Sequence, residues 1–266
     1  MGPDPVLIGI LNVTPDSFSD GGEFLDPDEA VSRAAMLLDE GARIVDVGGE
    51  STRPGSDPVS PEEELRRVVP VVRGILRERP EAVVSIDTYR ASTAEAALDA
   101  GARMINDVTA LGDPKMARLV AERDCPVVLM HMRGEPKSMQ QDPFYEDVVR
   151  EVRDFLAYRA DRAVRAGVNE ARIILDPGIG FGKTLEHNLT LLNRLDALAE
   201  LGFPMLVGAS RKSFLGRISG GGPKERLFGT VATNVLAYER GATFFRVHDV
   251  WANREALEVA AAIRRA

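Results

Sequence analysis

Eight short apolar runs alternate with segments long enough for a helix, and this alternation constrains the fold more than any other feature of the sequence. The runs cover residues 7–13, 44–47, 83–87, 104–107, 127–131, 173–176, 205–210 and 244–249. Nearly continuous apolar runs of this length are typical of parallel strands buried on both faces. Strands joined by crossover helices require a parallel sheet. We therefore predict one domain over residues 1–266, a (β/α)8 TIM barrel; an open doubly wound sheet is the alternative that periodicity leaves open.

The segments between the runs carry the signals of helix ends. Asp26 is followed by proline and acidic residues, which favour a helix N-terminus, and Ser60 opens a capping box. Apolar residues then recur at helical spacing until Pro80, which cannot continue a helix. A glycine precedes three of the eight runs, as expected just after the end of a helix. The other expected helices are residues 144–166, 186–201, 224–240 and 252–265.

Composition excludes several classes of protein. The formal net charge is -8, which argues against non-specific binding to nucleic acid. Cys125 is the only cysteine, so an internal disulfide and a multi-cysteine metal site are both excluded, and we expect this thiol to be buried. No apolar run approaches the roughly 18 residues of a membrane span. We therefore expect a cytoplasmic protein with no membrane or nucleic-acid partner.

At or near the end of every apolar run stands a residue able to form hydrogen bonds. In a barrel, all eight such residues would lie at the carboxyl ends of the strands, where enzymes of this fold build their active sites. Any one of them could be polar merely because loops are polar, but eight together indicate a site. These residues are Asn12, Asp46, Asp87, Asn106, His131, Asp176, Ser210 and His248.

Two segments have the composition of an anion-binding site. Loop 46–55 combines glycines with Thr52 and Arg53, and a guanidinium can bind two phosphate oxygens at once. Arg246 and His248 alternate with apolar residues on the last run, so both should point to the same face. A phosphate group would suit this cluster, although an arginine on the surface and a histidine in the core are the alternatives.

A second group of polar residues suits a flat heterocycle. Asp87, Asn106, Asp176 and Lys212 combine two carboxylates, an amide and an ammonium, and buried carboxylates need N–H donors from a ligand or a structural ion pair. The glycine-rich segment 176–183 fits neither the P-loop nor the dinucleotide-binding spacing. We interpret its glycines as allowing the backbone to approach a flat ligand, with Phe181 as a ring contact.

Taken together, the motifs of this chain resemble those of the dihydropteroate synthases. The resemblance spans residues 8–250 in the order of that family's motifs, and several long matches in order are specific. The matching segments are residues 9–22, 45–55, 85–88, 105–108, 130–132, 176–183, 210–214 and 246–250. The resemblance implies a transferase of folate biosynthesis, which condenses 6-hydroxymethyl-7,8-dihydropterin diphosphate with 4-aminobenzoate and releases pyrophosphate.

The resemblance also implies roles for individual residues. The predicted pterin-binding residues are Asp87, Asn106, Met130, Asp176, Phe181, Gly208 and Lys212. The predicted diphosphate-binding residues are Asn12, Thr52, Arg53, Arg246 and His248, with Asn12 also binding Mg²⁺. The predicted aminobenzoate-binding residues are Pro54, Phe181, Lys212 and Ser213. Catalysis is assigned to Asp87, Asp176, Lys212, Arg53, Arg246 and His248.

Two other functions remain as alternatives. A pterin-dependent methyltransferase would share the barrel and the pterin carboxylates but would not need the cluster of Thr52, Arg53, Arg246 and His248. A non-catalytic pterin-binding homologue would be expected to lack Arg53, Lys212 or the pair on the last run, and all are present. The resemblance further suggests a homodimer formed through barrel helices, for which exposed apolar positions on the last three helices are the place to look, and sulfonamides as mimics of aminobenzoate.

Overall fold

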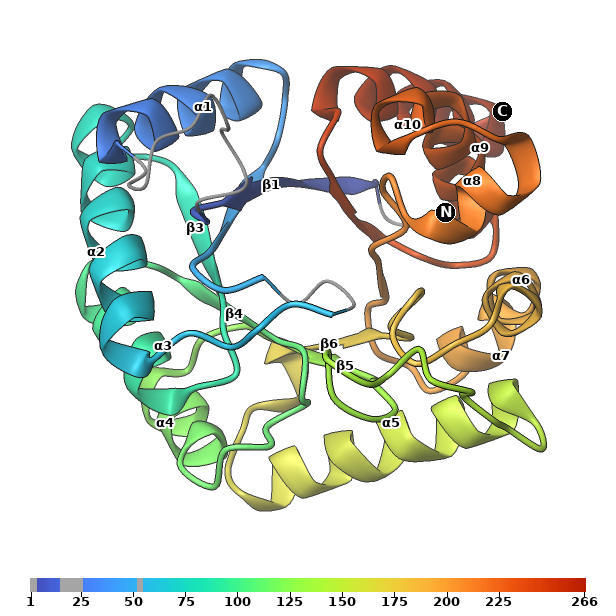
Figure 1. The fold of residues 1–266 in the computed structure, drawn as a ribbon, viewed down its shortest axis with the longest axis horizontal. Coiled ribbons are helices and arrows are strands. Elements are labelled where there is room, and N and C mark those ends of the chain that lie inside the picture. The colour runs from blue at the N-terminus through green and yellow to red at the C-terminus, as the bar shows by residue number, and fades with distance from the viewer. Residues whose placement is uncertain (1–3, 15–25, 52–54) are drawn as a thin grey trace.

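The chain forms a barrel of parallel strands, as a computed structural model that describes residues 4–14, 26–51 and 55–266 shows (Figure 1). Strand β1 pairs with both β2 and β8, and the strands follow the order β6-β5-β4-β3-β2-β1-β8-β7. A parallel bridge between Leu175 and Met205 joins the two ends of this order. The predicted TIM barrel is therefore confirmed, and the open sheet is excluded. The strands are β1 (Val6–Asn12), β2 (Ile44–Gly48), β3 (Val83–Asp87), β4 (Met104–Asp107), β5 (Val127–Met130), β6 (Ile173–Asp176), β7 (Leu206–Val207) and β8 (Phe244–Val247).

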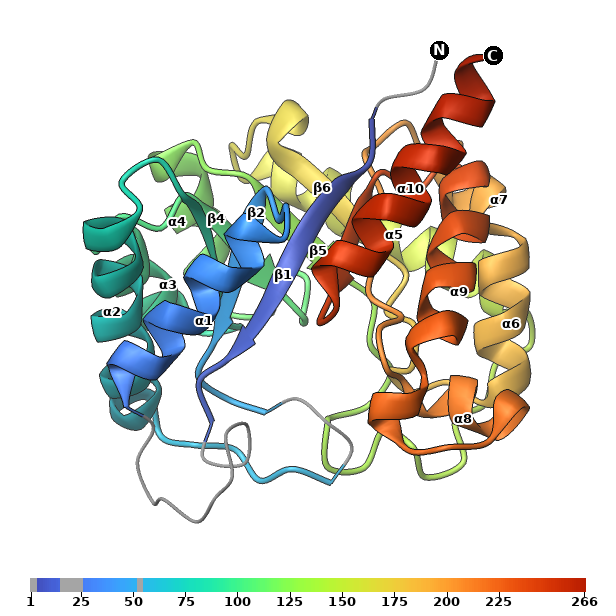
Figure 2. The same cartoon turned by 90° about the horizontal axis from the view of Figure 1, so that it is seen from above.

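Helices surround the barrel on the outside (Figures 1 and 2). They are α1 (Pro27–Asp39), α2 (Pro61–Glu78), α3 (Ala91–Asp99), α4 (Met116–Arg123), α5 (Val148–Arg165), α6 (Leu185–Asn193), α7 (Leu195–Ala199), α8 (Ser213–Ser219), α9 (Leu227–Glu239) and α10 (Val250–Arg265). Short 3-10 turns cover Glu170–Arg172 and Pro223–Glu225. The start of β1 and the end of α10 lie at the same end of the barrel, where Arg265 pairs with Asp4 at 2.6 Å.

The predicted helix ends are largely confirmed. The Asp26 carboxylate accepts a hydrogen bond from the Asp28 amide at 2.9 Å, and Ser60 Oγ accepts one from the Glu63 amide at 3.2 Å. Helix α2 ends at Glu78, before Pro80. The glycines that follow α1, α3 and α9 all have positive φ, the conformation that ends a helix most readily when the residue lacks a Cβ. They are Gly41, Gly101 and Gly241.

Four predicted boundaries were wrong. Helix α5 begins at Val148 instead of residue 144, because the Asp147 side chain caps it by accepting from the amides of Val149 and Arg150. The expected helix 186–201 is interrupted at Arg194, whose φ of -119° and ψ of 32° are not helical. Segment 224–240 begins with a 3-10 turn, so α9 starts only at residue 227. Of the expected strand 205–210, only Leu206 and Val207 form β7 and Met205 adds one bridge, and the short helix α8 that follows was not predicted.

Apolar side chains form two separate layers on the two faces of the barrel wall. One cluster lies between the strands and the helices and includes Val45, Ile105 and Phe245. The other fills part of the barrel interior; it consists of Ile8, Ile44, Met104, Val128, Ile174 and Leu206. Successive residues of a strand alternate between these two layers, as the period of a strand requires. The residue two positions after an inner apolar residue therefore also points into the barrel.

Two sequence-based expectations concern the chain as a whole. Cys125 is buried, with 6% of its surface exposed, and burial raises the pKa of its thiol to about 11. None of the helices in the described ranges has the length and apolar composition needed to cross a membrane. The single-domain organisation and the cytoplasmic location stay predictions.

Candidate active site

Polar side chains fill the carboxyl end of the barrel interior. Two positions before each of Asp46, Asn106, Asp176 and Arg246 on its strand stands an inner apolar residue, so these four side chains point inward. Asp87 ends β3 and is in register with Asn106 on β4. The predicted grouping of Asp87, Asn106 and Asp176 at one end of the barrel is therefore confirmed as geometry.

Arg246 connects two of the carboxylates. Its Nε donates to Asp46 Oδ2 at 2.6 Å, and its Nη2 donates to Asp87 Oδ2 at 2.7 Å. The side-chain amide of Asn106 also donates to Asp46 Oδ2, at 3.0 Å. Within the described residues, the buried Oδ1 of Asp46 has no hydrogen-bond partner. Arg246 was predicted to bind diphosphate, but in this structure its guanidinium is paired with the carboxylates below the rim.

Burial dominates the ionisation of this cluster. Burial raises the pKa of the Asp87 carboxyl to about 7, although the nearby Arg246 guanidinium lowers it and the Asp46 carboxylate raises it further. Burial alone would lower the pKa of Arg246, but the two carboxylates raise it overall, so this guanidinium stays charged. The cluster therefore contains one permanent cation shared between two acids, and Asp87 gains or loses a proton near neutral pH.

Asp176 and Lys212 form the other half of the site. Asp176 Oδ1 accepts a hydrogen bond from the Gly178 amide at 2.7 Å, and burial raises the pKa of the Asp176 carboxyl. Lys212 Nζ donates to the Ile179 carbonyl and lies 4.3 Å from the centre of the Phe181 ring. Burial lowers the pKa of Lys212 to about 7, while the Asp176 carboxylate opposes that shift. An acid and an amine that both titrate away from their ordinary ranges are frequent at functional sites.

Two glycines of segment 176–183 are required by contacts within the chain itself, and their predicted contact with a flat ligand stays a prediction. A Cβ on Gly178 would lie 1.8 Å from the carbonyl oxygen of His131, and a Cβ on Gly182 would lie 2.2 Å from that of Arg133. Both glycines also have positive φ. The close approach that requires them is therefore to the backbone after β5. A Cβ on Gly178 would also lie 3.4 Å from the Met130 side chain, and a Cβ on Gly180 would meet Lys212, so both border predicted site residues.

Lys183 forms hydrogen bonds to the backbone of the same segment and was not predicted as a site residue. Its Nζ donates to the carbonyls of Gly178 and Phe181, at 3.0 Å each, and lies 2.9 Å from Nδ1 of His131. Lys183 is 3% exposed, and burial lowers the pKa of its ammonium well below the ordinary value. The pKa of His131 falls to about 2 for the same reason, so this imidazole is neutral. His131 is thus a packing partner of Lys183 at the end of β5.

Two predicted diphosphate-binding residues lie at the mouth of the barrel. Asn12 ends β1, and among the described residues no hydrogen bond to its side-chain amide is present. His248 follows β8, and its Nδ1 lies 3.0 Å from Ser210 Oγ. Ser210 and His248 were both predicted among the strand-end residues, and the structure brings them into contact. Thr52, Arg53 and Pro54 lie outside the described residues.

The donor set around Asn12 fits Mg²⁺ only in combination with a substrate. In the described part of the chain, no group of three or more His, Cys, Asp or Glu residues is placed to hold a metal. Mg²⁺ commonly uses one or two protein oxygens together with phosphate oxygens and water. An amide oxygen at the mouth of the barrel therefore fits a metal that arrives with the diphosphate.

The other predicted residues line the same end of the barrel. Met130 is in register with Asp176, and a Cβ on Gly208 would meet only the Cβ of Arg246, at 3.9 Å. Ser213 is exposed at the start of α8, next to Lys212. The site thus has a polar interior and a more open border formed by Phe181, Lys212 and Ser213.

Sequence reasoning omitted two members of this site. Asp46 was recognised as a strand-end residue but received no role, although its position at the end of an apolar run is the same signal that selected Asp87. Lys183 ends the glycine-rich segment, and its only signal is that it closes the motif. The burial of Lys183 cannot be inferred from the neighbouring glycines alone.

Comparison with known proteins agrees with this geometry. The family model described as "Pterin binding enzyme" matches residues 8–248. A dihydropteroate synthase of Synechocystis is 48% identical over 97% of this chain and 90% of its own length.

Two solved structures are similar over nearly the whole chain. The dihydropteroate synthase of Yersinia pestis, solved with a sulfonamide drug, has a TM-score of 0.94 and 45% identity, covering 99% of this chain and 95% of that one. The Xanthomonas albilineans enzyme in complex with 7,8-dihydropteroate has a TM-score of 0.90 and 44% identity, with the same two coverages. A family model that spans the barrel and relatives of this identity and coverage lead to one conclusion: the chain belongs to the pterin-binding enzymes, in the dihydropteroate synthase family.

Proposed function

We propose that this protein joins the pterin of 6-hydroxymethyl-7,8-dihydropterin diphosphate to 4-aminobenzoate, forming 7,8-dihydropteroate and pyrophosphate. The observation that carries the proposal is the polar interior at the carboxyl end of the barrel, where Asp87, Asn106 and Asp176 offer the acceptors that a flat heterocycle with ring N–H donors needs. The relative solved with 7,8-dihydropteroate supports this product.

The pterin is bound by groups that need a partner. Asp46 and Asp87 already share the Arg246 guanidinium, whereas the Asp176 carboxylate accepts a hydrogen bond only from the Gly178 amide among the described residues. A buried carboxylate is costly without further hydrogen bonds. Ring N–H and amino groups of a pterin would supply donors to Asp176 and Asp87, and the Asn106 amide offers both a donor and an acceptor.

The reaction breaks one C–O bond and forms one C–N bond. The bond between the exocyclic carbon and the diphosphate breaks, and its electron pair leaves with the diphosphate. The cation left on that carbon is shared with the pterin ring, and the carboxylates of Asp87 and Asp176 stabilise it electrostatically. The neutral arylamine nitrogen attacks the carbon and then loses its proton to solvent. No covalent link to the protein is needed.

The departing diphosphate requires positive charge at the mouth of the barrel. Asn12, Arg246 and His248 are the described residues proposed to bind it, together with Thr52 and Arg53 by resemblance. We propose that Asn12 also holds Mg²⁺, which when bound neutralises charge on the diphosphate. The aminobenzoate is proposed to lie against Phe181, Lys212 and Ser213, with Pro54 beside it.

The decisive experiment is an assay of pyrophosphate release with the dihydropterin diphosphate and Mg²⁺, with and without 4-aminobenzoate. Release that depends on the amine and matches dihydropteroate formation, followed by chromatography, is expected. Tight pterin binding without an amine-dependent product would contradict the proposal and favour a non-catalytic binder or a methyltransferase. Repeating the assay with EDTA tests the metal, since activity should fall and return when Mg²⁺ is restored.

A sulfonamide is expected to compete with the amine. The Yersinia pestis relative was solved with such a drug. Inhibition should therefore be overcome by raising the 4-aminobenzoate concentration, whereas raising the pterin concentration should not relieve it.

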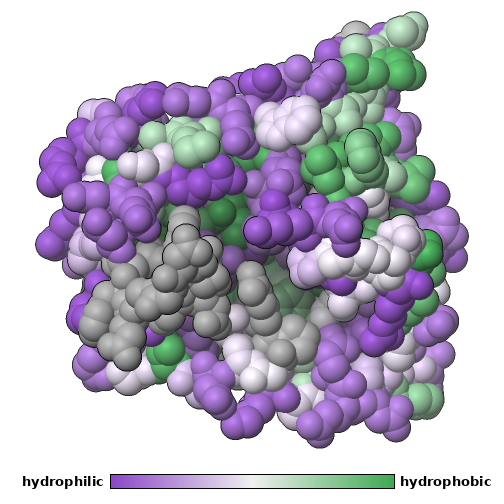
Figure 3. Space-filling model, turned by 45° about the horizontal axis from the view of Figure 1, so that its top comes forward, coloured by the Kyte–Doolittle hydropathy of each residue, from purple (hydrophilic) through white to green (hydrophobic). Residues whose placement is uncertain are grey.

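We also propose that two copies associate through α9 and α10. Phe228 and Leu236 on α9 are 84% and 56% exposed, and Val259 and Ile263 on α10 are 56% and 71% exposed. The members of the two pairs are eight and four residues apart, spacings that place them on one broad face of a helix. Figure 3 shows hydrophobic surface gathered over the C-terminal helices. Sedimentation should give twice the mass of one 28.9 kDa chain, and Ile263→Glu should shift it to a single chain without changing turnover per active site.

A further inference from the structure

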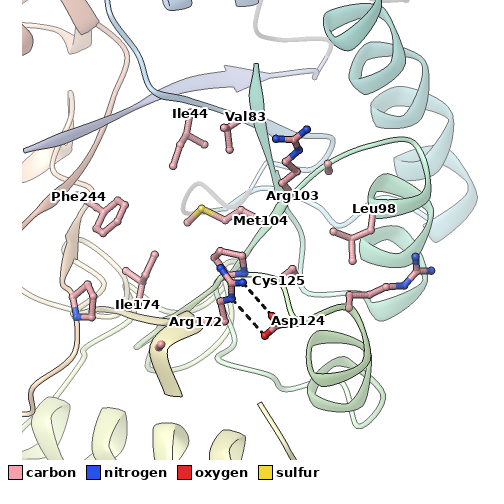
Figure 4. A pocket seen from close by; sticks show the side chains of 15 residues that line it. Ile44, Val83, Leu98, Arg103, Met104, Asp124, Cys125, Arg172, Ile174 and Phe244 are labelled. Atoms are coloured by element: carbon pink, nitrogen blue, oxygen red, sulfur yellow. Dashed lines mark hydrogen bonds and ion pairs between the residues drawn. The ribbon is translucent and has the colours of Figure 1, made fainter. Parts of the chain in front are cut away.

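A cavity opens at the end of the barrel opposite the candidate active site. Its volume is about 620 Å³. Five of its lining residues are the first or second residues of strands: Ile44, Val83, Met104, Ile174 and Phe244. Their side chains converge on one space in Figure 4. A volume of roughly 300–1,000 Å³ is typical of pockets for small ligands.

The floor of this cavity is apolar because of the alternation within the strands. Ile44, Met104 and Ile174 belong to the inner apolar cluster, and Val83 and Phe244 pack against it. The polar members of the same inward rows stand two or more positions further along each strand, at the other end of the barrel. The floor can therefore contact only an apolar body.

The rim of the cavity is positively charged. It carries three arginines and one acid, and the lining includes Arg103, Arg123, Arg172 and Asp124. Arg172 pairs with Asp124 at 3.1 Å, and Arg123 pairs with Asp99 at 2.6 Å. Arg103 is exposed and forms no ion pair with any described residue. Its guanidinium is thus available to an anion that enters the cavity.

We propose that this cavity is a second ligand site, which binds a small organic anion with an apolar body. The apolar part would rest on Ile44, Met104 and Phe244, and the anionic group would pair with Arg103. Figure 4 shows the Arg103 and Arg172 guanidinium groups on two different sides of the lining. The site lies at the amino ends of the strands, so its occupant need not resemble either substrate of the proposed reaction.

The probe for this test is 8-anilinonaphthalene-1-sulfonate, an aromatic sulfonate that fluoresces when its rings leave water. Titration of the protein should give saturable binding of one probe per chain at this site. Arg103→Glu should weaken that binding at least fivefold. The matched control is Arg43→Glu, because Arg43 follows the same Gly-Ala pair before a strand and is also exposed, but does not line the cavity. It should change binding less than twofold.

The only cysteine provides a readout located in the cavity. Cys125 is among its lining residues, and its raised pKa makes reaction slow, so iodoacetamide labelling is best followed near pH 9. The probe should slow labelling in the wild-type protein and in Arg43→Glu, and should slow it much less in Arg103→Glu. Equal probe binding by all three proteins, or a labelling rate that the bound probe leaves unchanged, would overturn the proposal.

Discussion

The two ends of the barrel interior differ in chemistry although they are built from the same strands. The lower end is formed by the amino ends of the strands and the upper end by their carboxyl ends. Along β2, Ile44 lies at the lower end and Asp46 at the upper end. Along β6, the corresponding residues are Ile174 and Asp176. The lower end gains stability from burial of apolar surface, whereas the upper end keeps acids in an environment that raises their pKa. One strand therefore contributes to folding with its first residues and to ligand binding with its last.

The largest expected effect comes from removing charge at the upper end. Asp176→Asn should lower kcat/KM by about 10²- to 10³-fold, because a charged acceptor facing a buried polar ligand is lost. Its melting temperature should stay within a few degrees of the wild type, or rise. Pyrophosphate release and thermal unfolding measure the two quantities.

The matched control is another buried acid at a strand end. Asp107 ends β4, but its carboxylate accepts hydrogen bonds from the amides of Thr109 and Leu111 at 2.7 and 2.8 Å. Asp107→Asn should therefore lower stability by about 1–3 kcal/mol and leave kcat/KM within a few-fold. If both variants lost activity equally, the division between the site and its surroundings would be wrong.

The second effect is a loss of stability at the lower end. Leu206 is 1% exposed inside the barrel, and Leu206→Ala should lower the free energy of unfolding by about 2–5 kcal/mol because it leaves a cavity. Chemical denaturation measures this change. At 25 °C, kcat/KM should stay within about threefold of wild type. A variant of normal stability and low activity would show that the two ends are not separate.

The third effect is a gain of stability in the variant Asp87→Asn, and the size of this gain depends on pH. The pKa of Asp87 is about 7 in the folded protein, above the ordinary 3.8, so the folded state binds this proton more tightly. The stability contributed by this group is complete below about pH 4 and is lost as the pH rises to 7. Asp87→Asn should therefore unfold a few degrees higher than wild type at pH 8, and the difference should shrink toward pH 4. A variant less stable than wild type at pH 8 would contradict the sign.

The smallest effect should come from the residue that holds the glycine-rich segment. Lys183→Met removes the donor to the carbonyls of Gly178 and Phe181, and we expect KM for the pterin to rise about 3- to 10-fold while kcat changes less. Stability should change little, because a buried cation is removed together with its hydrogen bonds. Lys115→Met, at an exposed helix start, is the control. An unchanged KM would leave Lys183 with a purely structural role.

Sequence patterns predicted the barrel because burial on both faces makes every strand a short apolar run. They also predicted polar residues close to the strand ends, although only Asn12, Asp87 and Asp176 are the last residues of their strands. The role of each of those residues could not be predicted from the sequence, because it depends on contacts between distant segments. Examples are the ring packing of His131 against Phe155 at 4.8 Å and the pairing of Arg246 with Asp46. The break at Arg194 and the start of α5 were missed because hydrophobic spacing continues across both points.

The ion pair between Arg246 and Asp46 joins residues 200 positions apart in the chain. A chain emerging from the ribosome presents its inward acids on β2, β3 and β6 long before β8 appears. Until then Asp46 and Asp87 lack their shared counter-charge and repel one another. The arrival of β8 supplies that charge and closes the ring between β1 and β7, so completing the chain and completing the pterin site are the same event. A fragment ending before residue 246 would lack both the Arg246 guanidinium and the strand that pairs with β1 and β7.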